Sequence, residues 1–242
     1  MKEVATVLYG SDNYGLNGPN SDKDYKVLLC PSFDEMYCSH KVDAGDLPKY
    51  YDKEHYSPMD CRKFDSLVHN CNPNVLEMVF STNWDAYENV LQYVNYAKDL
   101  LNSHYLALRW NDFYSAVHGI VMNTFKRYGF NNKAVSRGYY LFLLVEYVVN
   151  NNFQMTDNTW RNNEHSVKAR EVRFGSSTTE ELKRLGESVQ NLFEDSKQYF
   201  SFSASQWCKN HPNEVVKAKE KAEILTNYMK FNIVLPLARH DF

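Results

Sequence analysis

The sequence has no excess of positive charge: 27 lysines and arginines stand against 30 aspartates and glutamates, giving a formal net charge of −3. Extensive binding to nucleic acid normally requires a basic surplus, so a nucleic-acid partner would need a local basic patch. The five cysteines are an odd number without a Cys-x-x-Cys pair, which argues against a disulfide framework or a zinc knuckle. We therefore expect free thiols in a reducing compartment.

Long hydrophobic runs are also missing. The most apolar stretch, residues 139–149, is too short to span a bilayer. The first residues lack a basic segment followed by an apolar one, so we expect no signal peptide, a cytoplasmic location and no membrane partner. What the chain has in abundance is aromatic residues, at 15%, which supply rings for a core and for any base-stacking surface. The oligomeric state is left open.

Two regions of different character follow each other along the chain. Residues 5–9 and 24–30 are typical of strands, and residues 50–59 predict a third strand that Pro58 confines to an edge or an end. From about residue 85, helical spacing dominates in residues 84–102, 109–129, 132–151, 178–200 and 213–234, with Thr179 as the expected cap of the fourth helix. We predict an α+β fold, with an α/β domain over residues 1–95 and an all-helical domain over residues 96–242.

The most informative stretch lies near the start of the chain. A strand that ends in Gly10 and Ser11 points backbone N–H groups and a hydroxyl at one spot, which suits a phosphate. Asp22 and Asp24 then stand two residues apart at the start of the next strand, so their carboxylates share a strand face. Such a pair repels itself unless a cation or a proton holds it, and Mg²⁺ prefers oxygen ligands of this kind.

Residues 9–29, YGSDNYGLNGPNSDKDYKVLL, resemble the signature of the DNA polymerase β-like nucleotidyltransferases, in which Gly-Ser is followed by Asp-x-Asp. Within that superfamily the chain looks most similar to the predicted nucleotidyltransferases of bacteria and phages, some of which are associated with RNA-repair ligases. Four stretches extend the resemblance along the chain: RKFDSLVHNCNPNVLEMVF, RYGFNNKAVSRGYYLFLLVEYVV, REVRFG and STTEELKRL. The resemblance implies a small polymerase-β-like domain with a mixed sheet, followed by a helical domain.

The resemblance also implies roles for individual residues. Gly10 and Ser11 would hold a nucleoside triphosphate, and Asp22 and Asp24 would be catalytic residues that coordinate Mg²⁺ or Mn²⁺. Family members use two such ions to activate a hydroxyl and to stabilise the leaving pyrophosphate.

Basic residues of the helical region are the remaining nucleotide-binding candidates. Lys133 and Arg137 share a helix face, four residues apart, and the resemblance favours contacts with the nucleotide phosphates. Arg173 is a weaker candidate for the same phosphates, because a salt bridge is an equally good explanation of its charge. Glu77 is interpreted as structural, either pairing with a basic residue or capping a neighbouring element.

A third carboxylate is expected on a later strand, often as the base for the attacking hydroxyl. The position where we expect it holds His55. We favour Glu54 as the catalytic replacement, although neighbouring strand residues face opposite ways and Glu54 would need a bulge or a shifted register. Asp52 and Asp60 remain open as alternatives.

The leading hypothesis is a magnesium-dependent enzyme that transfers a nucleoside monophosphate to a hydroxyl of an RNA end, a protein or a small molecule. The first alternative is a regulatory module that binds nucleotide without turnover, which the His55 substitution favours. The second is an antitoxin-type nucleotidyltransferase that modifies a partner protein.

Overall fold

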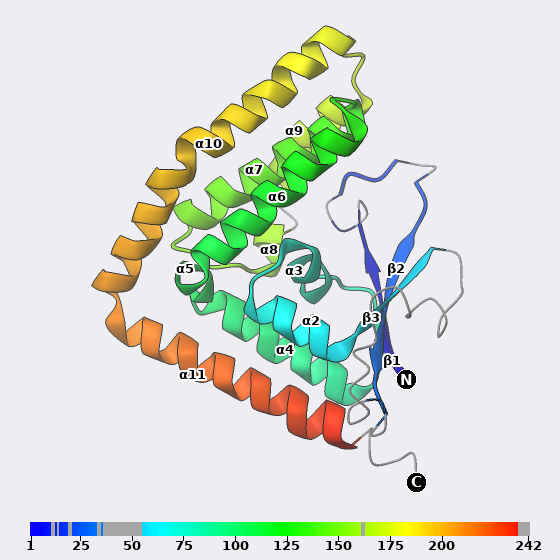
Figure 1. The fold of residues 1–242 in the computed structure, drawn as a ribbon, viewed down its shortest axis with the longest axis vertical. Helices are drawn as coiled ribbons and strands as arrows, with labels where there is room; N and C mark the ends of the chain where they lie inside the picture. The colour runs from blue at the N-terminus through cyan, green and yellow to red at the C-terminus, as the bar shows by residue number, and fades with distance from the viewer. Residues whose placement is uncertain are drawn as a thin grey trace.

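The computed structural model describes residues 1–10, 13, 15–18, 21–32, 35, 55–160 and 163–236, without the side chains of residues 158, 160 and 163. It is an α+β structure in which a small mixed sheet is followed by helices (Figure 1). The strands are β1 (Lys2–Tyr9), β2 (Asp24–Cys30), β3 (Tyr56–Asp60) and β4 (Trp84–Ala86), and their order in the sheet is β3-β2-β1-β4. The α+β class and the mixed sheet are thus confirmed.

The pairing of the strands places the start of β2 beside the end of β1. β1 is antiparallel to β2, with Tyr9 opposite Asp24, and it is also antiparallel to β4 on its other side. β3 runs parallel to β2, with Tyr25 opposite Tyr56. Pro58 therefore lies in an edge strand, as predicted, where its missing N–H leaves no ladder bond unmade.

The helices among the described residues lie mainly after the sheet. They are α2 (Cys61–His69), α3 (Pro73–Val79), α4 (Glu88–Asn102), α5 (Tyr105–Leu108), α6 (Trp110–Tyr128), α7 (Asn132–Asn150), α8 (Asp157–Trp160), α9 (Asn163–Phe174), α10 (Thr179–Asn210) and α11 (Pro212–Tyr228), followed by a π-helical turn, η2 (Met229–Val234). The cap of α10 is Thr178, one residue before the predicted Thr179, because Thr178 and Glu181 form a reciprocal capping box.

One hydrophobic core joins the sheet to the helices. It runs from Val7 in β1 through Phe64 in α2 and Tyr140 in α7 to Leu225 in α11, each fully buried. The predicted division at residue 95 falls inside α4, so no break in the core accompanies it. α2 and α3 pack against the strands, and α10 and α11 lie along the outer side of the other helices (Figure 1).

Two expectations from the sequence, free thiols and no membrane-spanning segment, can be compared with the described part of the chain. Cys30, Cys61, Cys71 and Cys208 are free cysteines, as predicted, while Cys38 lies outside the described residues. None of the helices in the described ranges combines the length and the apolar character that crossing a bilayer requires.

α9 docks on α7 and thereby reaches the region between helices and sheet. The Ser136 hydroxyl donates to the Ala169 carbonyl at 2.7 Å, and the Asn132 side-chain amide donates to the Val172 carbonyl at 2.9 Å. The guanidinium of Arg170 in turn donates to the Gly15 carbonyl at 3.3 Å. These bonds hold the C-terminal half of α9 beside the N-terminal end of α7 and the segment that follows β1.

Candidate functional site

The end of β1 leads into a tight turn next to Asp24, the first residue of β2. Gly10 has a φ of 91°, in the left-handed region that favours glycine, and a Cβ built there would lie 3.6 Å from Oδ2 of Asp24. The Asn13 backbone N–H donates to the Gly10 carbonyl at 3.0 Å, and the buried Asn13 side chain donates to the Leu8 carbonyl at 2.8 Å. Gly10 and Asp24 are therefore neighbours, as the sequence predicts for a Gly-Ser turn that faces an Asp-x-Asp strand.

Glu77 holds this turn in place through a hydrogen bond. The side chain is only 1% exposed, on the short helix α3, and its Oε1 accepts a hydrogen bond from the Gly10 backbone N–H. The Asn72 side chain caps α3 by accepting from the Asn74 N–H, and Pro73 occupies the first turn, where its missing N–H leaves no hydrogen bond unmade. Because Glu77 accepts the Gly10 N–H, that particular donor faces the carboxylate rather than a phosphate.

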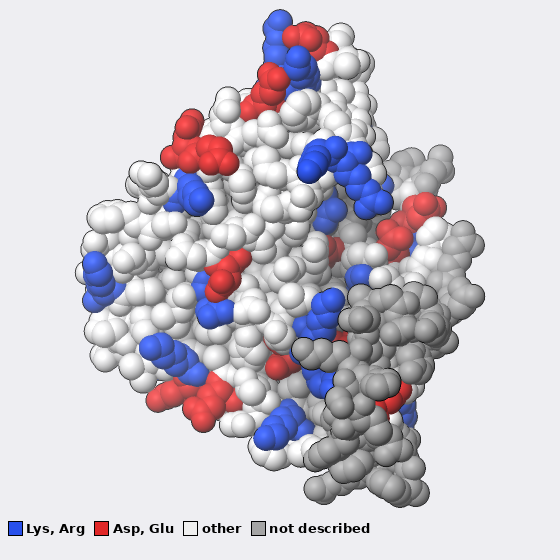
Figure 2. Space-filling view, viewed as in Figure 1, with Lys and Arg blue, Asp and Glu red and all other residues white. Residues whose placement is uncertain are grey.

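Three basic side chains of the helical region lie in the same pocket as this turn. A pocket of about 230 Å³ lies between helices and sheet and is lined by Tyr9, Gly10, Leu16, Asp24, Asn74, Glu77, Lys133, Arg137 and Arg173. The guanidinium of Arg137 donates to Oδ1 of Asn74 at 3.3 Å, which connects α7 with α3. Basic and acidic side chains meet around a hollow between the helices and the strands on the face drawn in Figure 2.

Electrostatic coupling across the pocket is visible in the pKa of Tyr9. Burial raises the pKa of the Tyr9 hydroxyl, the carboxylates of Asp24 and Glu77 raise it further, and Arg137 lowers it. The hydroxyl therefore stays protonated at neutral pH and can donate a hydrogen bond. All four side chains line one pocket, so charges from β2, α3 and α7 act on the same space.

Lys26 lies next to this pocket on the same face of β2 as Asp24. Its Nζ donates to the Ser57 hydroxyl at 2.6 Å and lies 4.8 Å from the centroid of the Tyr9 ring. Burial lowers the pKa of Lys26, while the Glu77 carboxylate opposes that shift. Sequence reasoning missed Lys26 and Tyr9, although the period of two along a strand would have placed Lys26 beside Asp24.

The position expected to hold a third carboxylate is occupied by His55. The parallel register of β2 and β3 puts His55 just before the Tyr25–Tyr56 pair, and its carbonyl accepts the Tyr25 N–H at 2.8 Å. Nδ1 of His55 lies 3.7 Å from Oδ1 of Asp24. The histidine has a φ of 63°, so the chain turns sharply as it enters β3. Glu54 and Asp52 lie outside the described residues.

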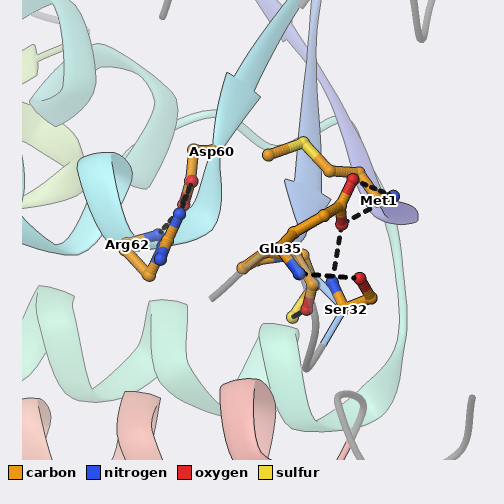
Figure 3. A network of polar contacts seen from close by, with 7 residues as sticks. Met1, Ser32, Glu35, Asp60 and Arg62 are labelled. Carbon is orange, nitrogen blue, oxygen red and sulfur yellow. Dashed lines mark hydrogen bonds and ion pairs between the residues drawn. The ribbon is translucent and has the colours of Figure 1, made fainter. Parts of the chain in front are cut away.

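Asp60 is excluded as the third carboxylate. It pairs with Leu29 at the far end of β2, five residues from Asp24, which corresponds to roughly 17 Å along a strand. Its carboxylate caps α2 by accepting the Arg62 N–H at 2.8 Å and holds the Arg62 guanidinium at 2.5 Å. Figure 3 shows this pair close to the contacts that Glu35 makes with Met1 and Ser32. The open alternative at Asp60 was wrong because the strand direction carries it away from the pocket.

The remaining predicted residues divide into two groups. Lys133 and Arg137 line the pocket together with Gly10 and Asp24, although more than a hundred residues separate the two pairs in the sequence. Asp22 is exposed, precedes β2 and is not among the residues that line the pocket. Ser11 lies outside the described residues.

No group of three or more His, Cys, Asp and Glu side chains within the described part of the chain forms a metal site on its own. Mg²⁺, however, is usually bound through one or two carboxylates together with substrate phosphates rather than by an all-protein cage. Asp24, at the edge of a pocket with three cations, supplies such a carboxylate, and Asp22 stands two residues before it. These carboxylates suit a metal ion that is bound together with a phosphorylated ligand.

Comparison with known proteins identifies no relative. No family model matches the chain, and neither the curated proteins nor the solved structures contain a match. The resemblance to polymerase β-like nucleotidyltransferases therefore stays a prediction from the motif. The pocket is the structural feature from which a function can be argued.

Proposed function

We propose that this protein is a magnesium-dependent nucleotidyltransferase of the polymerase β-like type, which transfers a nucleoside monophosphate from a nucleoside triphosphate to a hydroxyl acceptor. The observation that carries the proposal is the pocket in which Asp24, at the Gly10 turn, faces Lys133, Arg137 and Arg173. A carboxylate opposite three cations suits a polyphosphate that is bound partly by side chains and partly through a metal.

The cations take the role of holding and orienting the triphosphate. Lys133 and Arg137 come from adjacent turns of α7, and Arg173 comes from α9, so the phosphates would be contacted from two elements. Burial lowers the pKa of Arg173, yet a guanidinium remains charged at neutral pH. Phosphoryl chemistry depends mainly on such positioning and charge stabilisation, because the protein forms few covalent bonds in it.

Gly10 contributes through its missing side chain. Its N–H is bonded to Glu77, and Oδ2 of Asp24 lies 3.6 Å from the position a Cβ would take, so the glycine lets the turn lie close to the Asp24 carboxylate. The Tyr9 hydroxyl, which stays protonated, is a further donor at the same wall of the pocket. Ser11 would add its hydroxyl in the role that the sequence motif assigns to it.

Asp22 and Asp24 are the residues that would hold Mg²⁺ or Mn²⁺ together with the triphosphate oxygens. When bound there, the metal supplies charge neutralisation at the α-phosphate and at the leaving pyrophosphate. In the transfer itself, an acceptor hydroxyl oxygen forms a bond to the α-phosphorus, and the bond from that phosphorus to the bridging oxygen of the β-phosphate breaks. The hydroxyl proton goes to a base, for which Glu54 is the candidate.

The first experiment measures pyrophosphate release from each of the four nucleoside triphosphates with Mg²⁺, in the presence and absence of short RNAs. We expect release with a preferred triphosphate, and its loss in Asp24→Asn, because that variant removes the carboxylate charge but keeps the side-chain shape. Lys133→Ala and Arg137→Ala should raise KM more than they lower kcat, since their charges act on the bound phosphates.

Two matched variants serve as controls for these substitutions. Asp85→Asn changes an exposed aspartate on β4, and Lys219→Ala changes an exposed lysine on α11, both outside the residues that line the pocket. If Asp24→Asn and Asp85→Asn release pyrophosphate at the same rate, Asp24 has no catalytic role and the proposal is wrong. A nucleotide-sized mass increase on a co-purified protein would identify a protein acceptor.

A nucleotide-binding module without turnover is the second candidate, and the observation in its favour is His55. This histidine stands 3.7 Å from Asp24 at the position where a third carboxylate is expected. Magnesium-dependent nucleotide binding, without pyrophosphate release for any triphosphate or acceptor, would support this reading. Release that is lost in Glu54→Gln would support the enzyme instead, with Glu54 as the base.

A further inference from the structure

A second pocket adjoins the first at the N-terminal end of α7. It has a volume of about 260 Å³ and is lined by Thr124, Tyr128, Asn131, Lys133, Ala134 and Arg137. Lys133 and Arg137 line both pockets, so the same two cations stand between them. Because Lys133 and Arg137 are four residues apart on one face of α7, their side chains lie next to each other between the two pockets.

The sizes of the two pockets suggest a single extended ligand. Sites for small molecules and cofactors usually measure roughly 300–1,000 Å³. Each pocket alone, at about 230 Å³ and about 260 Å³, falls below that range, whereas the two joined at Lys133 and Arg137 fall within it. A ligand with a charged part and a larger uncharged part would fill both.

The two linings differ in chemistry. The first pocket contains Asp24 and Glu77 as well as cations, whereas no acidic side chain lines the second among the described residues. The second pocket instead offers the ring of Tyr128, the methyl group of Ala134 and the side chain of Thr124. An uncharged, partly apolar group is the natural occupant of such a lining.

Tyr128 is presented to this pocket by the turn between α6 and α7. It is the last residue of α6 and is 58% exposed, so its ring is accessible to a ligand. Gly129 follows with a φ of 66°, which ends the helix, and Asn131 fixes the turn by donating to the Tyr128 carbonyl at 3.1 Å. Oδ1 of Asn131 also accepts the Ala134 N–H at 2.8 Å, so the turn is anchored to α7.

We infer that the second pocket binds the base and ribose of a nucleoside triphosphate whose phosphates lie in the first pocket, with the base stacked on the ring of Tyr128. This assignment rests on the proposed function and adds the direction in which the nucleotide lies, from Asp24 past Lys133 and Arg137 to the end of α6. The Arg127 guanidinium lies over one face of the Tyr128 ring, 5.2 Å from its centroid, so the base would stack on the opposite face. Stacking on an aromatic ring suits every base, so Tyr128 provides affinity rather than base selection.

The test compares the dissociation constants of the four nucleoside triphosphates with that of inorganic tripolyphosphate, each with Mg²⁺, by isothermal titration calorimetry. Tyr128→Ala should weaken the binding of nucleoside triphosphates by about 5- to 150-fold, the range for the loss of one base–aromatic stack. Tyr128→Phe keeps the ring and should keep the affinity. Neither variant should change the affinity for tripolyphosphate, which has no base.

The matched control is Tyr199→Ala, since Tyr199 is 65% exposed on α10 and lines neither pocket. Equal nucleotide affinity in Tyr128→Ala and the unchanged chain, with tripolyphosphate still bound, would overturn the inference and leave the proposed function standing. Equal weakening of nucleotide and tripolyphosphate would also overturn it, because Tyr128 would then act on the phosphates. Failure of the unchanged chain to bind either ligand would remove both the inference and the proposed function.

Discussion

Glu77 offers the sharpest test of how the turn at the end of β1 is held in place. The side chain is 1% exposed, and its carboxylate accepts the backbone N–H of Gly10, sixty-seven residues earlier in the chain. Replacement by alanine removes this acceptor and leaves the Gly10 N–H without its partner from α3. It also removes one buried methylene group together with the carboxylate.

The size of the effect follows from these two losses. A hydrogen bond to a charged acceptor contributes about 1.5–3 kcal/mol, and burial of one methylene group adds about 0.8 kcal/mol. Glu77→Ala should therefore lower the free energy of unfolding by about 2–4 kcal/mol. For a chain of this size each kcal/mol lowers Tm by about 2–4 °C, so the expected loss is roughly 5–15 °C.

The assay is urea unfolding followed by circular dichroism, with thermal unfolding as a second measurement. Glu77→Gln is the matched variant, because its amide oxygen can still accept the Gly10 N–H while the charge is gone. We expect Glu77→Gln to be more stable than Glu77→Ala. The reasoning is refuted if Glu77→Ala unfolds at the same urea concentration as the unchanged protein, or if Glu77→Gln is the less stable of the two.

Two further predictions concern stability. Gly10→Ala should lower the free energy of unfolding by about 1–2 kcal/mol, because φ is 91° there, whereas Gly119→Ala, inside α6 with open space beside its Cα, should be neutral or stabilising in the same urea assay. Burial raises the pKa of Tyr105 from 10.0 to about 12, so the stability that its neutral hydroxyl gives is complete below pH 10 and is lost as the pH rises toward 12. Tyr105→Phe should therefore flatten the alkaline fall in the free energy of unfolding, by up to about 3 kcal/mol, and an equally steep fall in the variant would contradict this.

The strands could be predicted where a turn residue marks their end in the sequence. Residues 24–30 form β2 as expected, because an apolar run there ends at Pro31. β1 starts at Lys2 rather than residue 5, since its first two residues are exposed and polar and carry no hydrophobic signal. The N-terminal cap of α10 was predicted to within a residue, because it depends on the local hydrogen bonds of Thr178. Other helix ends were predicted less well: α4 begins at Glu88 rather than at residue 84, since Trp84–Ala86 forms β4, and α10 continues to Asn210 rather than ending at residue 200.

The site was predictable only in part, because tertiary packing assembles it. Gly10 and Asp24 come together through the local pairing of β1 with β2, which the motif indicates. Lys133 and Arg137 were found through the resemblance and their helical spacing, but no sequence pattern shows that α7 would face the β1 turn. Asn74 belongs to a stretch that carries the resemblance, but its hydrogen bond with Arg137 was not predicted from the sequence.

The predicted domain boundary falls inside a helix for a related reason. Residue 95 lies inside α4, whose buried face includes Tyr93 and Ala97 on either side of it. Composition changes there from mixed α/β to helical, yet the helix contributes to one core with the strands. A shift in composition therefore located the change of architecture but could not show whether the core continued across it.

If the proposed function is right, the charges around the pocket should favour a metal-bound triphosphate over a bare one. Three cations, Lys133, Arg137 and Arg173, line the pocket opposite two carboxylates. Glu77 is engaged with the Gly10 N–H, whereas Asp24 would repel any phosphate that approached it alone. In the proposed function, a divalent cation bound to the phosphates would turn that repulsion into attraction, so Asp24 would weaken the binding of free polyphosphate and strengthen the binding of its magnesium complex. In that arrangement Lys133, Arg137 and Arg173 would hold the phosphates farther from Asp24, and the base would lie at Tyr128, in the pocket that no acidic side chain lines among the described residues.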